Sequence, residues 1–114
     1  MSADALYQRG FQHRCNGEYA PAQELFQQAL RLDPNHKPSL LQSALILGFT
    51  GDFDGSLAAL STLHQRFPTD DEILYELAMT QMMLGEDELA CSNFRTILAR
   101  NPDHEKAQQQ IAYC

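Results

Sequence analysis

Proline and glycine recur in this chain with a fixed period, and that period constrains the fold more than any other feature. Three prolines are spaced 34 residues apart: Pro34, Pro68 and Pro102. Three glycines keep the same spacing: Gly17, Gly51 and Gly85. Apolar residues recur at helical intervals on both sides of each glycine. Each 34-residue repeat is therefore predicted to form a helix, a glycine turn, a second helix and a proline turn.

The residues at the turns agree with this helical pattern. Each glycine falls where a first helix must end, a position that favours the left-handed backbone conformation. The next residue is always an acid (Glu18, Asp52 or Glu86), which favours the positive N-terminal end of the second helix. Each proline stops a second helix shortly after its last apolar residue. Thr69 and Glu72 have the spacing of a capping box for the helix that opens the third repeat.

The pattern resembles the tetratricopeptide repeat family, whose repeats are about 34 residues long with small, aromatic and proline residues at fixed places. The first repeat, 3–36, carries Gly10, Tyr19, Ala22, Phe26, Ala29 and Pro34. The third repeat, 71–104, carries Ala78, Gly85, Ala90, Phe94 and Pro102. The second repeat, 37–70, keeps Ala44, Gly51, Phe53 and Pro68 but holds Ser56, Leu60 and Leu63 at three signature places. The resemblance covers nearly the whole chain.

The resemblance implies an all-α fold, a right-handed superhelical array of antiparallel helix pairs with seven helices. The chain, residues 1–114, is then a single domain of repeats. Residues 105–114 are expected to form either a capping helix over the last repeat or the opening helix of a truncated fourth repeat. The sequence leaves that choice open.

Composition excludes several classes of partner. The chain has 8 basic and 15 acidic side chains, a net charge of −7. Binding to nucleic acid or to an anionic membrane needs clustered Lys and Arg, so neither is expected. The longest apolar run, 44–47, is too short to span a bilayer, and the N-terminus lacks the order of a signal peptide. A cytoplasmic protein is therefore predicted.

The cysteines point the same way. Cys15, Cys91 and Cys114 are an odd number and show no C-x-x-C spacing. A disulfide framework is therefore not expected, and a reducing compartment is the simpler interpretation.

No constellation of residues indicates catalysis, a cofactor or a metal. His36 and His104 hold equivalent places after two of the prolines, which predicts loop residues about two repeats apart. The acidic clusters lie at helix starts, where they favour the helix dipole. The periodic glycines are solitary, so no phosphate-binding loop is formed. The chain is predicted not to be an enzyme.

The first helix of each repeat carries more apolar surface than its core needs. In the second repeat Leu41, Leu45 and Phe49 follow one another at i, i+4 and i+8, beside the core stripe. In the family that the chain resembles, these faces line a concave surface. The predicted groove consists of Tyr7, Phe11, Arg14, Leu41, Gln42, Leu45, Phe49, Tyr75, Glu76, Met79 and Met83. The alternative is that some of these residues are core.

The leading functional hypothesis is a scaffold that binds a peptide or an amphipathic helix of another protein in this groove. The third repeat holds 2 basic and 7 acidic residues, so a partner segment with a basic residue toward that end is expected. Some members of the family hold the acidic C-terminal tails of heat-shock chaperones with Lys, Asn and Arg side chains on their first helices. This type of binding is disfavoured here, because other residues stand at the corresponding positions. Those places are occupied by Tyr7, Phe11, Gln42, Glu72 and Glu76.

Two other hypotheses remain open at this stage. In the first hypothesis, the chain is the N-terminal segment of a larger enzyme, for example a bacterial transferase. In the second, it is a homo-oligomer that associates through the groove or through its C-terminal helix. Similarity to the repeat-based chaperones of bacterial secretion systems is a further possibility within the binding class.

Overall fold

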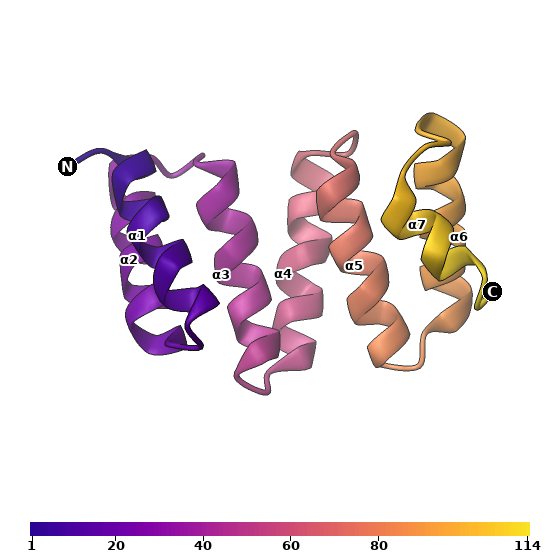
Figure 1. Ribbon diagram of the computed structural model, residues 1–114, viewed down its shortest axis with the longest axis horizontal. Helices are drawn as coiled ribbons and strands as arrows, with labels where there is room; N and C mark the ends of the chain where they lie inside the picture. The colour runs from indigo at the N-terminus through magenta and orange to yellow at the C-terminus, as the bar shows by residue number, and fades with distance from the viewer. The chain divides into compact units, whose positions relative to one another are not determined.

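The computed structural model describes residues 1–114, which form seven α-helices and no strand (Figure 1). The helices are α1 (Ala3–Cys15), α2 (Tyr19–Leu32), α3 (Lys37–Phe49), α4 (Phe53–Arg66), α5 (Asp71–Met83), α6 (Asp87–Arg100) and α7 (Glu105–Ile111). None of these helices is long and apolar enough to cross a membrane. The chain divides into two compact units, Met1–Ser56 (unit 1) and Leu57–Cys114 (unit 2), with the boundary inside α4.

The glycine turns have the predicted backbone. The φ angles of Gly17, Gly51 and Gly85 are +77°, +99° and +80°, and no other kind of residue in the chain has positive φ. After Gly17, the N–H of Glu18 donates to the carbonyl of His13 at 2.9 Å. This return to a carbonyl five residues earlier is the hydrogen bond of a Schellman motif, and it recurs after the other two glycines. The turn therefore closes one helix and sets the start of the next.

The residues that cap the starts of α3, α5 and α7 differ from the sequence prediction. The cap of α5 is Asp70, whose side chain accepts from the N–H of Ile73 at 3.0 Å, so the capping box predicted from Thr69 is wrong. Asp70 directly precedes the first helical residue, and its carboxylate also suits the helix dipole. His36 and His104 are the N-cap residues of α3 and α7 rather than plain loop residues.

In unit 1, α1 packs against α2 and α2 packs against α3. The centre of this packing is Phe26, which is completely buried and clusters with Ala22 and Ile46. Gly10 allows α1 to approach it closely, since a Cβ atom at this position would lie 2.8 Å from Cε1 of Phe26. Ser56, at the start of α4, is also buried and donates to the carbonyl of Ala44 at 2.8 Å.

In unit 2, α5 packs against α6, and α6 packs against α7. The largest completely buried side chains of this packing include Phe94 and Ile97 of α6, and α7 adds Ala107. Arg100, at the end of α6, forms an ion pair with Asp71 at 2.7 Å and donates to the carbonyl of Pro68 at 2.9 Å. The end of α6 is thereby fixed to the start of α5.

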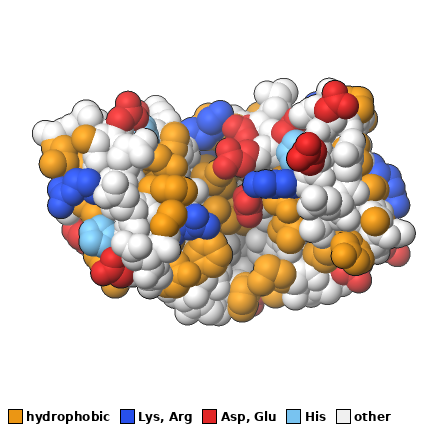
Figure 2. Space-filling view, in the orientation of Figure 1, with side chains coloured by type: hydrophobic (Ala, Val, Ile, Leu, Met, Phe, Trp, Pro, Cys, Tyr) orange, Lys and Arg blue, Asp and Glu red, His pale blue; other side chains and the backbone are white.

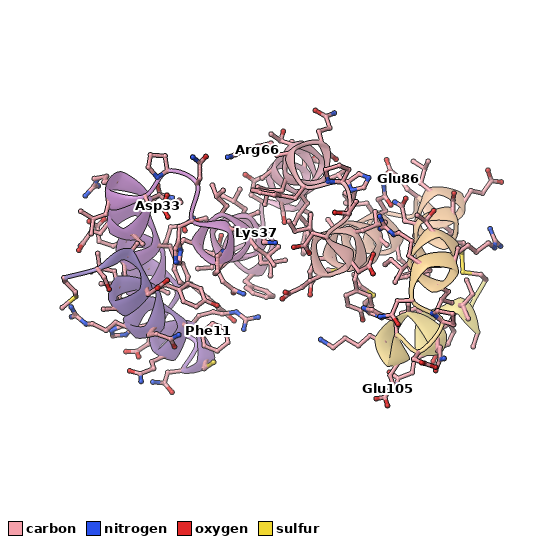
Figure 3. All side chains as sticks on the ribbon, turned by 90° about the horizontal axis from the view of Figure 1, so that it is seen from above. Phe11, Asp33, Lys37, Arg66, Glu86 and Glu105 are labelled. Carbon is pink, nitrogen blue, oxygen red and sulfur yellow. A yellow bond between two sulfur atoms is a disulfide. The ribbon has the colours of Figure 1, made fainter.

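A disulfide joins Cys91 of α6 to Cys114, which follows α7 (Figure 3). The expectation that the cysteines form no disulfide is therefore wrong. The two cysteines are 23 residues apart in sequence, and only the reversal of the chain between α6 and α7 brings them together. Cys15 is exposed and has a free thiol.

The close contact at Gly10 gives a test of the helix packing. Gly10→Ala is expected to destabilise the fold by about 1–3 kcal/mol, because the new methyl group must displace the buried ring of Phe26. Gly48→Ala is the matched control: its Cβ would lie 3.4 Å from Oγ of Ser56, an ordinary contact in a helix. This control is expected to be neutral or to stabilise by up to about 1 kcal/mol. Urea denaturation followed by circular dichroism measures both, and equal effects would contradict the packing argument.

The disulfide gives a second test. Cys114→Ser is expected to lower the unfolding free energy of unit 2 by about 3 kcal/mol, since the unfolded chain is no longer closed into a loop. Reduction by dithiothreitol is expected to reproduce the effect in the unaltered chain. Cys15→Ser is the control and is expected to change nothing, because that thiol is exposed and unpaired. Denaturation curves that are the same with and without reductant would show that the bridge does not contribute.

Candidate functional site

The structure places the predicted groove residues in three exposure classes. Leu41, Gln42 and Leu45 are only 4%, 7% and 9% exposed, so these side chains belong to the interior and are not offered at the surface. Phe49 and Met83 are 46% and 63% exposed. The remaining members are half-buried: Tyr7, Phe11, Arg14, Tyr75, Glu76 and Met79. The accessible surface is therefore smaller than the sequence predicts, and its members are divided between units 1 and 2.

In unit 1 the accessible residues gather around one arginine. The guanidinium carbon of Arg14 lies 5.5 Å from the ring centroid of Phe11 and 5.0 Å from that of Phe49. Tyr19 stacks on Phe49 with the ring centroids 5.5 Å apart. We call these four residues, Phe11, Arg14, Tyr19 and Phe49, the unit 1 surface. Phe11 projects from α1 on the side where α3 lies (Figure 3), and hydrophobic side chains gather over α3 (Figure 2).

The turn geometry explains why these four side chains meet. Phe11 and Arg14 are three residues apart on α1 and so lie on one face of that helix. Tyr19 begins α2 directly after the glycine turn, and Phe49 is the last residue of α3. Sequence reasoning assigned Tyr19 to the repeat signature and missed its place on the surface. No periodicity within one helix could have revealed it, because its contact with Phe49 joins two helices.

At its other end, unit 1 holds an internal network of rings and hydrogen bonds. Tyr7 lies 5.7 Å from Phe26 and 5.7 Å from His36, measured between ring centroids. His36 is buried; its Nε2 pairs with the carboxylate of Asp4 at 2.6 Å, and its Nδ1 lies 2.8 Å from Oγ of Ser39. These contacts join α1, α2 and α3, so Tyr7 and His36 are largely committed to structure. The sequence does carry a signal for this network, because Tyr7, Phe26 and His36 recur 68 residues later as a tyrosine, a phenylalanine and a histidine.

Unit 2 repeats the ring arrangement 68 residues later but leaves it more open. Tyr75 lies 5.9 Å from Phe94 and 5.8 Å from His104, between ring centroids, and Nζ of Lys106 lies 5.7 Å from the Tyr75 ring. Nδ1 of His104 accepts from the N–H of Ala107 at 3.1 Å. A shallow hollow of about 310 Å³ adjoins these rings. It is lined by Glu72, Tyr75, His104, Glu105 and Lys106.

The environment of Tyr75 favours the neutral form of its hydroxyl. Burial raises the pKa of Tyr75 above its ordinary value of 10.0, and the negative charge of Glu76 raises it further. A hydrogen bond with the side chain of Gln110 acts in the opposite direction. The phenol is therefore a neutral hydrogen-bonding group at physiological pH rather than a base.

The accessible part of α5 is apolar and adaptable. Tyr75, Met79 and Met83 follow one another at i, i+4 and i+8, and we call them the unit 2 surface. Methionine side chains are unbranched and polarisable, so they adjust to partner groups of different shape. The chemistry that units 1 and 2 each offer is therefore contact with apolar and aromatic side chains, together with one arginine in unit 1.

Comparison with protein families identifies the fold. Two tetratricopeptide repeat models match residues 3–36 and 72–104, which together make up more than half of the chain. The chain belongs to the tetratricopeptide repeat family. Its fold is accordingly an all-α array of tetratricopeptide-type helix pairs with seven helices. A comparison with curated proteins found no match.

Solved tetratricopeptide structures share this fold. The first TPR of Spaghetti (RPAP3), bound to the HSP90 peptide SRMEEVD, matches with a TM-score of 0.85 and 14% identity, over 98% of this chain and 89% of that one. The type III secretion translocator chaperone SycD of Yersinia enterocolitica matches with a TM-score of 0.85 and 18% identity, over 98% of this chain and 89% of that one. PcrH, in complex with the chaperone binding region of PopB, matches with a TM-score of 0.79 and 23% identity, over 97% of this chain and 92% of that one. At these identities the likeness establishes the fold alone.

The titration of Tyr75 tests the described environment of the unit 2 surface. Glu76→Gln is expected to lower the pKa of Tyr75 by removing a like charge, and Gln110→Ala is expected to raise it. Because the pKa of Tyr75 in the folded chain lies above 10.0, this group's contribution to the free energy of unfolding is complete below pH 10.0. It is lost as the pH rises through the folded pKa. Ultraviolet difference titration of phenolate, with Tyr113→Phe to remove the most exposed tyrosine signal, measures the shift. A Tyr75 that titrates like an exposed phenol would contradict this.

Proposed function

We propose that this chain is a protein-interaction module that binds an apolar segment of another protein through the exposed faces of its first helices. The observation that carries the proposal is Phe49, which is 46% exposed at the end of α3 and stands between Arg14 and Tyr19. Aromatic and arginine side chains are enriched among the residues that dominate protein interfaces. A soluble protein that gathers them on one surface is best explained by a partner.

The structures with similar folds support the class of function. One holds the HSP90 peptide SRMEEVD, and another is a complex with the chaperone binding region of PopB. In both structures the similar protein is bound to another polypeptide. The shared fold makes the same class of activity reasonable for this chain, although the low identity carries over no partner.

The unit 2 surface and the charge of the third repeat indicate the chemistry of the partner. Met83 is 63% exposed and Met79 is half-buried, which suits contact with apolar side chains of varied shape. Residues 71–104 hold 7 acidic and 2 basic side chains. The proposed partner is therefore a peptide or an amphipathic helix, apolar with a basic residue directed toward unit 2.

The organisation of the module follows from the same proposal. We assign repeats to 3–36, 37–70 and 71–104, with residues 105–114 as a capping helix. Ala107 of α7 is completely buried, so the apolar side of this helix is used within its own chain. This disfavours α7 as the occupant of another copy's surface. The Cys91–Cys114 disulfide favours an oxidising compartment over the cytoplasm that the cysteine count predicts.

Selection from a display library of random linear peptides tests the proposal without knowledge of the natural partner. The immobilised chain is expected to enrich peptides that bind at about micromolar affinity. Phe49→Glu is expected to weaken the binding of these peptides about tenfold or more, because it places a charge where apolar side chains of the peptide are buried. The matched control is Leu32→Glu on α2, since Leu32 is 59% exposed and lies outside both surfaces. Fluorescence anisotropy measures affinity, and circular dichroism confirms that both variants are folded.

Two results would contradict the proposal. One is a library that yields no binder to the folded chain. The other is a set of binders that respond equally to Phe49→Glu and Leu32→Glu, because their binding then does not use the unit 1 surface.

A further inference from the structure

Arg14 is held in place but has no charge partner. Its guanidinium group contacts the rings of Phe11 and Phe49, and the structure gives it neither an ion pair nor a side-chain hydrogen bond. The chain nevertheless has nearly twice as many acidic as basic side chains, 15 against 8. By contrast, Arg100 pairs with Asp71 and also donates to a carbonyl. Arg9 also lacks an ion pair, but Arg14 is the arginine held between the rings of Phe11 and Phe49 in the unit 1 surface.

The way in which Arg14 is held leaves its donors available. Cation–π contact with Phe11 and Phe49 gives the guanidinium group no hydrogen-bond acceptor such as a carboxylate or carbonyl oxygen, so its five N–H donors remain available to a partner. The two rings therefore restrict the side chain without using its hydrogen-bonding capacity. A partner group would meet an arginine whose rotamer freedom is already reduced, so less entropy is lost when it binds. The surrounding aromatic surface also lowers the local dielectric and strengthens a charged contact.

We propose that Arg14 is the point at which the unit 1 surface receives a carboxylate, namely the Asp or Glu side chain of a partner segment. This inference rests on the proposed function and adds a chemical requirement to it. A carboxylate accepts two parallel N–H donors from one guanidinium group, which makes it the matching acceptor for a single arginine. Apolar side chains next to that acid in the partner then contact Phe49 and Phe11 on either side of Arg14.

A phosphorylated partner is a poorer match. A phosphate group carries nearly two negative charges and is bound in most proteins by several donors. Arg14 is the single cation of the four residues in the unit 1 surface, and the chain as a whole has a net charge of −7. The charge of one carboxylate balances that of one arginine, so the partner segment is expected to carry one acidic side chain where it meets the unit 1 surface.

A reversal of charge at Arg14 tests the inference directly. The same peptide library is selected in parallel on the unaltered chain, on Arg14→Glu and on Arg9→Glu. The unaltered chain is expected to enrich Asp and Glu beside apolar residues, and Arg14→Glu is expected to enrich Lys and Arg at the same place. Arg9→Glu is the matched control, because Arg9 is an exposed arginine on the same helix that donates to Sδ of Met1 and lies outside the unit 1 surface. This control is expected to keep the acidic preference.

A double-mutant cycle then measures the contact itself. The tightest selected peptide is used with its acid unchanged or replaced by the corresponding amide, against the unaltered chain and Arg14→Met, which keeps an unbranched apolar stem. Each single change is expected to weaken binding about tenfold or more, and the second change is expected to add little. Urea denaturation of Arg14→Met shows separately whether the side chain also contributes to stability.

The outcomes separate this inference from the proposed function. Peptides that depend on Phe49 but carry no acidic preference, or that bind Arg14→Met as tightly as the unaltered chain, would overturn the carboxylate site and leave the interaction module standing. Tighter binding of a phosphoserine form of the peptide than of its acidic form would overturn the carboxylate in favour of phosphate. Absence of any Phe49-dependent peptide would defeat the proposed function itself, and the carboxylate site with it.

Discussion

The left-handed glycine turn is the local constraint on which each helix pair depends. At Gly17 the chain must take a φ of +77°, and the following N–H then returns to a carbonyl of the preceding helix. That geometry ends one helix and begins the next within a few residues, so the two helices run antiparallel with little freedom. In unit 1 the same turn brings the last residues of α1 beside the first residue of α2. The turn therefore places Arg14 and Tyr19 where both contact Phe49, the last residue of α3.

A shared scaffold can still present different surfaces. Unit 1 and unit 2 both place a tyrosine between a buried phenylalanine and a capping histidine, at nearly the same distances. In unit 1, Asp4 bonds to the buried His36 and so closes the arrangement. In unit 2, a shallow hollow lies beside His104, and Lys106 covers the ring of Tyr75. The repeat thus fixes the position of the rings, while one or two polar residues decide how accessible they are.

The periodic features were predictable from sequence, whereas the features that join separate segments were not. Spacing predicted the helices and the positive φ angles because both depend on residues that are near neighbours in the chain. The same stripe pattern placed Leu41 and Leu45 on the surface, although both are buried, since periodicity shows a helix face but not what covers it. The Cys91–Cys114 disulfide depends on how α7 reverses over α6. The number and spacing of the cysteines could not predict that contact. For the site, Phe11, Arg14 and Phe49 were named from the pattern, but their arrangement required the folded chain.

The position of Arg14 gives the unit 1 surface a direction. Acidic residues concentrate in the third repeat, whereas the first repeat has almost equal numbers of acids and bases and holds Arg14 among aromatic rings. Apolar contacts alone would accept a segment in either orientation, because burial of apolar surface has no polarity. A carboxylate bound to Arg14 would make the reversed orientation unfavourable at the unit 1 surface, since the arginine would then lose its acceptor. Specificity in this chain would therefore come from a few charges, with the apolar residues supplying most of the affinity.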